Sequence, residues 1–115
     1  MVTIYVLIDP WNNRPFYVGS TNRPLKERLK AHCNGLGTCH NMDEALRRKS
    51  MLLSAIIESP YKPKIQALFV CEESRATFCE ALAYEILNDN GYVLYQTASR
   101  FQRYAAKYNK QFANK

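Results

Sequence analysis

Two apolar stretches joined by a turn open the chain: residues 2–8 (VTIYVLI) and 15–19 (PFYVG), with 9–13 (DPWNN) between them. β-branched and aromatic residues are typical of strands, whereas proline and asparagine are typical of turns. The pattern therefore predicts an antiparallel hairpin at the N-terminus.

The register of this hairpin decides which side chains share a face, because side chains alternate along a strand. With Asp9 opposite Pro15, Tyr5 lies opposite Gly19. Tyr17 is then diagonal to Tyr5 on the same face. We therefore expect two tyrosines and a glycine to line one patch of the sheet.

The chain from residue 21 to residue 96 alternates between helical and strand patterns. Thr21 or Asn22 can cap a helix that ends near Cys33. Asn41 can open a second helix, which ends near Glu58. The pattern further predicts a strand over 64–71, a helix over 74–88, and a short strand or extended segment over 92–96.

Residues 97–115 carry apolar side chains at helical spacing, with cations largely on the other faces. The apolar positions are Phe101, Tyr104, Ala105, Tyr108 and Phe112. We predict a basic, aromatic C-terminal helix that packs on the same domain. Its basic face, with Arg100 and Arg103, would add contacts to phosphates.

The charge of the chain points to a class of partner. The 115 residues suit one domain, and 16 Lys+Arg against 10 Asp+Glu give a net charge of +6. Such a surplus on a small surface favours an anionic partner, nucleic acid first among them. No apolar run approaches the roughly 20 residues of a transmembrane helix, and no signal-like segment opens the chain. We therefore expect a cytoplasmic protein that does not contact a membrane.

The four cysteines permit two interpretations. Without a signal peptide, we expect reduced thiols in a reducing compartment. The alternative is a zinc site, since Cys33, Cys39 and His40 lie close together in the sequence, with His32 beside them. Their spacing fits none of the usual zinc motifs, so reduced thiols are the default.

A short ordered set of residues carries the chemistry: Thr3-Ile4-Tyr5, then Tyr17-Val18-Gly19, then Arg28 and His32. In this order the sequence resembles the GIY-YIG nuclease family, and in particular its small single-domain members of phage or bacterial type. The two tripeptides match the two signature elements, and Arg28 and His32 match the family's arginine and its histidine or tyrosine. The resemblance extends less sharply to about residue 96.

The resemblance implies a fold and an activity. The implied fold is α/β (α+β): a small three-stranded antiparallel sheet flanked by helices, in the order β-β-α-α-β-α, with the nuclease domain over 1–96. The implied activity is metal-dependent hydrolysis of phosphodiesters, normally in DNA. This sequence departs from the family pattern at Thr3 in place of a glycine, at Ser20 in place of a lysine that some members carry, and at Gln96 near a usual asparagine.

The family also has a glutamate on the third helix that binds a divalent metal. Glu80 and Glu85 both follow the pattern Ala-x-x-x-Glu. The face of Glu80 continues through apolar residues, whereas the face of Glu85 continues through Asn88 and Asp89. We therefore select Glu80 as the ligand of Mg²⁺ or Mn²⁺ and keep Glu85 as the alternative.

Each residue of the set suits a step of phosphodiester hydrolysis. Arg28 would hold the scissile phosphate through a planar, charge-assisted fork. The family mechanism suggests a tyrosine as general base, and we select Tyr5. His32 would accept the proton onward or orient the hydroxyl, and Tyr17 would orient water or phosphate. The ordinary tyrosine pKa near 10 is high for a base, so a nearby cation or metal-linked network would have to lower it.

The remaining basic residues would bind the nucleic-acid backbone. We select Lys26, Lys30, Arg47, Arg48, Lys49, Arg100 and Arg103. The same charge would serve a catalytically inactive nucleic-acid-binding module of this fold, which is the alternative to an endonuclease. Branched or nicked DNA, RNA and the oligomeric state all stay open.

Overall fold

The computed structural model describes residues 1–34 and 44–95. Within them the predicted α+β order β-β-α-α-β-α is confirmed, with a 3₁₀ turn added before the last helix. The elements are β1 (Val2–Asp9), β2 (Arg14–Thr21), α1 (Leu25–Asn34), α2 (Glu44–Glu58), β3 (Lys64–Cys71), η1 (Glu73–Arg75) and α3 (Ala76–Asp89).

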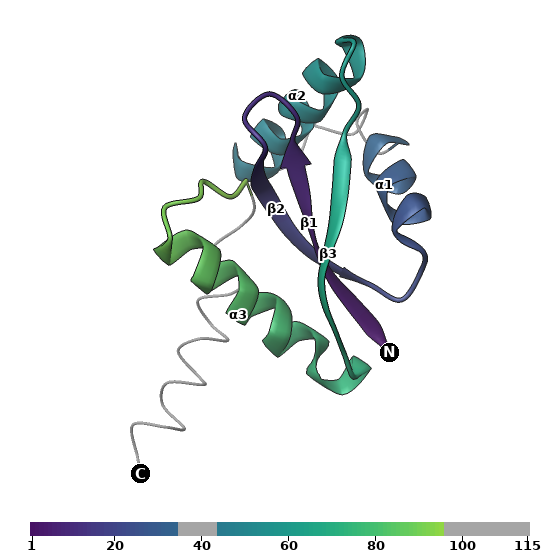
Figure 1. Ribbon diagram of the computed structural model, residues 1–115, viewed down its shortest axis with the longest axis vertical. Coiled ribbons are helices and arrows are strands. Elements are labelled where there is room, and N and C mark those ends of the chain that lie inside the picture. Colours follow the sequence, from purple (N-terminus) through teal and green to yellow (C-terminus); the bar gives the residue numbers. More distant parts are fainter. Residues whose placement is uncertain (35–43, 96–115) are drawn as a thin grey trace.

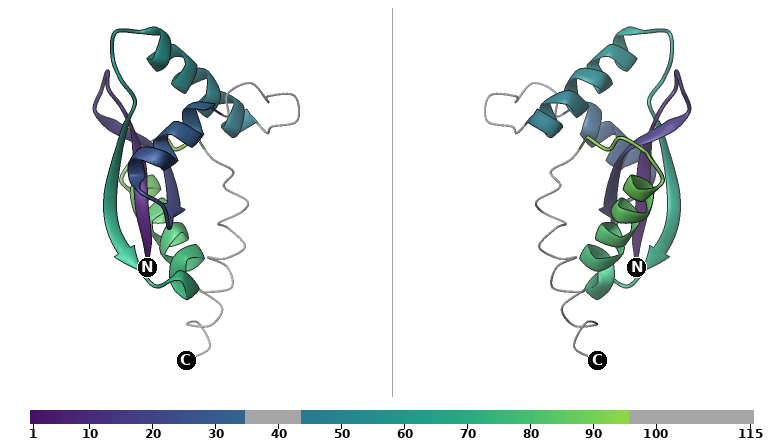
Figure 2. Two further views of the ribbon diagram at one scale, coloured as in Figure 1. Left: turned by 90° about the vertical axis from the view of Figure 1, so that its right-hand side faces the viewer. Right: turned by 90° about the vertical axis from the view of Figure 1, so that its left-hand side faces the viewer.

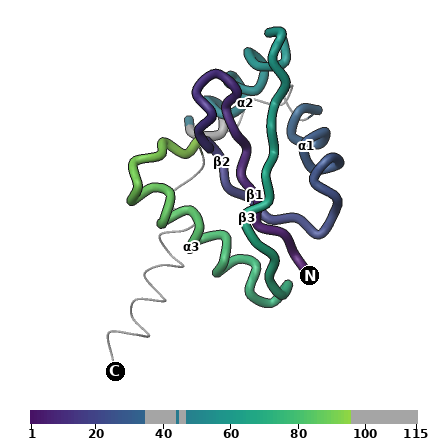
Figure 3. The backbone as a smooth tube through the Cα atoms, viewed as in Figure 1, coloured from purple at the N-terminus to yellow at the C-terminus, as the bar shows by residue number. Residues whose placement is uncertain are grey.

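The three strands form one antiparallel sheet in the order β2-β1-β3. β1 is central because it carries the most apolar sequence, and five consecutive residues from Ile4 to Ile8 are at most 9% exposed. Figure 1 shows α1 and α3 on opposite sides of the strands. Figure 3 shows the chain path, which leaves the hairpin through α1 and α2 before returning beside β1 as β3.

The hairpin register is confirmed at the tyrosine patch but not at the turn. Tyr5 pairs with Gly19, as predicted, whereas Asp9 pairs with Arg14 and not with Pro15. A β-bulge between the two regions absorbs the difference, because Phe16 has no partner on β1. A bulge places one extra residue in a strand and locally changes where its side chains point.

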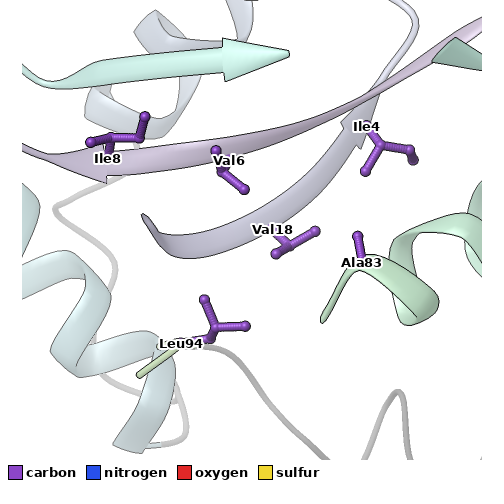
Figure 4. Close-up of a cluster of buried hydrophobic side chains, with 6 residues drawn as sticks. All are labelled: Ile4, Val6, Ile8, Val18, Ala83 and Leu94. Atoms are coloured by element: carbon purple, nitrogen blue, oxygen red, sulfur yellow. The ribbon is translucent and has the colours of Figure 1, made fainter. Parts of the chain in front are cut away.

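Because side chains alternate along β1, they pack into two separate apolar clusters, one on each face of the sheet. On the α3 side, Ile4, Val6 and Ile8 pack with Val18, Ala83 and Leu94 (Figure 4). On the α1 and α2 side, Tyr5 and Leu7 pack with Phe16, Leu53 and Ile56. Both faces of β1 are therefore buried, and each helix layer has its own core.

The third strand lies at an edge of the sheet and is largely exposed. Its bounds agree with the prediction, but Leu68, Phe69 and Val70 are each at least 40% exposed. Figure 2 shows β3 along the outside of the molecule, with no described helix beyond it. Ile57 of α2 is also 45% exposed, because the buried stripe of this helix runs through Leu53 and Ile56.

The last described residues return to the hairpin. Gly91, at φ 87°, follows α3 in the left-handed conformation that commonly ends helices. Residues 92–95 do not form a strand, and the Tyr95 N–H donates to the Phe16 carbonyl at 2.7 Å. The predicted C-terminal helix over 97–115 lies outside the described residues. No helix in the described part of the chain is both long and apolar enough to cross a bilayer.

Candidate active site

The hairpin places Tyr5, Tyr17 and Gly19 on the face that α1 and α2 cover. The ring centroids of the two tyrosines are 6.5 Å apart. A Cβ added to Gly19 would lie 2.5 Å from Tyr5 Cζ and 3.0 Å from Cε1, and its nearest neighbour would be the hydroxyl itself. Gly19 is therefore required here because the phenol of Tyr5 lies directly across its backbone.

The Tyr5 hydroxyl is the centre of a buried hydrogen-bond network. Arg28 Nε donates to it at 3.1 Å, and His32 Nε2 lies 2.6 Å from it. Both partners come from α1, one turn apart, so helical spacing brings them to the same atom. The joint placement of Tyr5, Arg28 and His32 is as the sequence pattern predicted.

The charges around the network decide its protonation. Burial, helped by the positive charges of Lys49 and Arg28, lowers the pKa of His32 to about 3, so this imidazole is neutral near pH 7. Arg28 can only donate, so the Tyr5 oxygen accepts from Arg28, and in the tautomer of His32 that carries its proton on Nδ1 the Tyr5 hydroxyl donates to Nε2.

The pKa of Tyr5 departs from the expectation. Burial raises it to about 12, although the hydrogen bond from Arg28 acts in the opposite direction. The cation that was expected to lower this pKa is present, but the loss of water around a completely buried hydroxyl outweighs it. Tyr5 is therefore a neutral phenol at pH 7.

Lys49 lies at the tyrosine patch, which the sequence analysis missed. Its ammonium is 4.2 Å from the ring centroid of Tyr17, and burial followed by the charge of Arg28 lowers its pKa to about 8. The sequence did contain a signal for this position, since Lys49 precedes Leu53 and Ile56 by four and seven residues and so shares the buried face of α2. The sequence analysis gave Arg47, Arg48 and Lys49 the same role, but Arg47 and Arg48 are exposed whereas Lys49 is half-buried.

Glu80 and Glu85 occupy different surroundings on α3. Glu80 is 4% exposed, and its Oε2 accepts a hydrogen bond from Ser20 Oγ at 3.2 Å. Glu85 is exposed. Ser20 follows Gly19 and points to the α3 side of the sheet. The end of β2 therefore lies between Glu80 on that face and the tyrosine network, formed by Tyr5, Arg28 and His32, on the other face.

The other selected residues are dispersed. Lys26, Lys30, Arg47 and Arg48 are exposed on the two helices, and Arg48 forms an ion pair with Glu44 at 2.8 Å. Arg100 and Arg103 lie outside the described residues, as do Cys39 and His40 of the alternative zinc site. Over the described ranges, no three His, Cys, Asp or Glu side chains are grouped as metal ligands.

Comparison with known proteins identifies the family. A family model described as the GIY-YIG catalytic domain matches residues 1–68, which include the tyrosine network but not Glu80. No curated protein sequence and no solved structure shows a significant match. Because residues 1–68 are more than half of the 115, the chain belongs to the GIY-YIG family, whose catalytic domain is a nuclease domain that acts on nucleic acid.

Proposed function

We propose that this protein is a divalent-metal-dependent endonuclease that hydrolyses phosphodiester bonds in DNA. The observation that carries the proposal is the buried Tyr5 hydroxyl held between Arg28 and His32, at 3.1 and 2.6 Å. A phenol between a permanent cation and a neutral imidazole has a donor on one side and a proton acceptor on the other. This is the arrangement that a proton relay needs.

Arg28 binds the scissile phosphate in this proposal. Its bond to Tyr5 uses only the Nε–H, whereas a guanidinium carries four more N–H groups on its terminal nitrogens. Those groups can form a bidentate contact to two phosphate oxygens. The phosphate is thereby held next to the phenol, and the charge that develops on its oxygens in the transition state is stabilised.

Tyr5 and His32 move the proton of the attacking water. The water gives a proton to Tyr5 Oη as the Tyr5 proton passes to Nε2 of His32. This coupled transfer does not require a free tyrosinate, which the pKa of about 12 makes rare at pH 7. It does form an imidazolium on His32, which the pKa of about 3 disfavours until the negative charge of a bound phosphate offsets the charges of Lys49 and Arg28. Tyr5 is completely buried, whereas Arg28 is only partly buried. The attacking water would therefore reach the Tyr5 hydroxyl from the side of Arg28.

Glu80 is the residue proposed to hold Mg²⁺ or Mn²⁺. The donor chemistry suits these ions, since Mg²⁺ is commonly held by one or two carboxylates together with substrate phosphate and waters. A bound cation would neutralise phosphate charge and stabilise the leaving oxygen.

The decisive experiment compares two carboxylates on one helix. Wild type, Glu80→Ala and Glu85→Ala are assayed on linear, nicked and branched DNA and on RNA, with Mg²⁺, with Mn²⁺ and with EDTA. We expect wild type and Glu85→Ala to cut DNA with either metal and to stop in EDTA. Glu80→Ala should bind DNA and cut at least about a hundredfold more slowly.

The other outcomes have distinct meanings. Loss of cutting in Glu85→Ala alone would reassign the metal ligand, and cutting of RNA but not DNA would change the substrate. The high pKa of Tyr5 favours one competing function, a catalytically inactive nucleic-acid-binding module. Binding of all substrates without cleavage by wild type would establish that function in place of the endonuclease.

A further inference from the structure

A cavity of about 430 Å³ lies beside the tyrosine network, and the proposed steps do not use it. It is bounded by the turn between β2 and α1, by the first turns of α1, and by η1 at the start of α3. Its polar lining is provided by Thr21, Asn22, Arg23, Glu27, Arg28 and Glu73. Small-molecule sites in proteins have volumes of about 300–1,000 Å³, so the cavity has room for one nucleotide.

The cavity adjoins both halves of the proposed active site. Arg28 is part of its wall and donates to Tyr5. Ser20, also in the wall, donates to Glu80. A phosphate held by Arg28 would therefore have its neighbouring nucleoside within reach of this cavity.

The two kinds of charge in the lining orient a bound nucleotide. Arg28 and Arg23 attract phosphate, whereas the carboxylates of Glu27 and Glu73 repel it. A nucleotide whose phosphate is held by Arg28 would therefore present its uncharged base, and not a second phosphate, to the carboxylates. The turn is held in shape by the Arg23 N–H, which donates to Thr21 Oγ1 at 3.1 Å.

We propose that this cavity is a subsite for the nucleoside next to the scissile phosphate and that it selects bases with an exocyclic amino group. A carboxylate accepts hydrogen bonds from the exocyclic amino groups of cytosine, adenine and guanine, whereas thymine has no amino group and offers only an N3–H flanked by two carbonyl oxygens that a carboxylate repels. Glu27 and Glu73 are the specificity residues. The assignment rests on the proposed function only in placing the phosphate at Arg28.

The test measures binding, so it does not depend on cleavage. The full ¹⁵N-labelled chain is titrated in EDTA with the trinucleotides d(CpCpC), d(ApApA) and d(TpTpT), and amide shifts give the site and the Kd. We expect shifts at residues 21–23 and 73–76, with d(CpCpC) and d(ApApA) bound about tenfold more tightly than d(TpTpT). An abasic trimer should shift residues 21–23 only.

Matched variants separate base recognition from general charge. Glu73→Gln and Glu27→Gln keep the shape of the side chain but can donate as well as accept, so the preference over d(TpTpT) should fall toward equality in at least one of them. Glu72→Gln removes the same charge from an exposed neighbour outside the cavity lining and should keep the preference.

Several results would overturn the proposal. Equal affinities for the three trimers in wild type would do so, as would shifts away from the cavity. A complete absence of shifts with millimolar trimer would also reject it. Failure of the nuclease proposal would appear separately, as a lack of DNA cleavage by wild type with Mg²⁺ or Mn²⁺.

Discussion

Ile4 and Tyr5 are neighbours on β1, and both are 0% exposed, yet they serve opposite sides of the sheet. Ile4 points toward α3 and contacts aliphatic side chains. Tyr5 points toward α1 and carries its hydroxyl into a network with Arg28 and His32. One strand thus supports an apolar core on one face and a polar, chemically capable core on the other.

The difference teaches how a small domain buries polar groups. A buried hydroxyl without a partner is costly, so the Tyr5 face must provide both a donor and an acceptor. The Ile4 face needs only close packing. Substitutions on the Tyr5 face should therefore mainly lower the cleavage rate, whereas substitutions on the Ile4 face should mainly lower the free energy of unfolding.

The largest expected effect is on the Tyr5 face. Arg28→Ala removes the proposed phosphate contact, and single-turnover cleavage should fall by about 10²–10³-fold. Arg28→Lys should restore little, because an ammonium cannot form the fork or reproduce the Nε–H bond to Tyr5. Lys62→Ala, which removes an exposed cation between α2 and β3, is the control and should cut nearly as fast as wild type. Equal rates for Arg28→Ala and Lys62→Ala would refute the assignment.

The Ile4 face should show the converse behaviour. Ile4→Ala leaves a cavity in the aliphatic cluster and should lower the free energy of unfolding by about 2–5 kcal/mol, measured by urea denaturation. Ile4→Val should cost about 0.5–1.5 kcal/mol. The cleavage rate per folded molecule should stay near that of wild type in both variants. A catalytic loss in Ile4→Val as large as that in Arg28→Ala would show that the two faces are not separate.

Gly19 tests the packing on the Tyr5 face. Gly19→Ala places a methyl group against the Tyr5 phenol, and we expect a loss of about 1–3 kcal/mol in unfolding free energy together with slower cleavage. In the double variant with Tyr5→Leu, the two losses in stability should be less than additive, because Leu lacks the hydroxyl, Cζ and Cε1 atoms that the added methyl group would meet. Strict additivity would contradict this account of the contact.

The last prediction concerns the pH dependence of stability. The pKa of His32 is about 3 in the folded protein against an ordinary 6.5, so the unfolded chain binds more protons between these values. The contribution of neutral His32 is fully present above pH 6.5 and is lost as the pH falls toward 3. One proton gives a slope of at most about 1.4 kcal/mol per pH unit. His32→Gln should flatten the urea-derived profile over that range, whereas an unchanged profile would exclude His32 as its source.

Much of the fold was predictable because it depends on local periodicity. The period of two in β1 separated Ile4 from Tyr5, and the turn residues after Asp9 identified the hairpin. Spacing along α1 brought Arg28 and His32 to one face. On α3 the same reasoning distinguished the buried Glu80 from the exposed Glu85.

Other features depend on how elements pack, which no local pattern contains. The bulge at Phe16 kept Tyr5 opposite Gly19 although the turn residues paired differently from the prediction. β3 has the composition of a buried strand, but it is at an edge because β1 takes the centre. Lys49 was expected on a solvated basic cluster, and packing of α2 brings it to Tyr17.

The sequence by itself determined the elements, the facing of their side chains and the set of residues that marks the GIY-YIG family, since these follow from spacing along the chain. Only the tertiary structure decided the protonation of that set and the cavity beside it. Desolvation depends on every element that surrounds a group, and for Tyr5 it outweighs the nearby Arg28, so the pKa rises where the sequence alone suggested a fall.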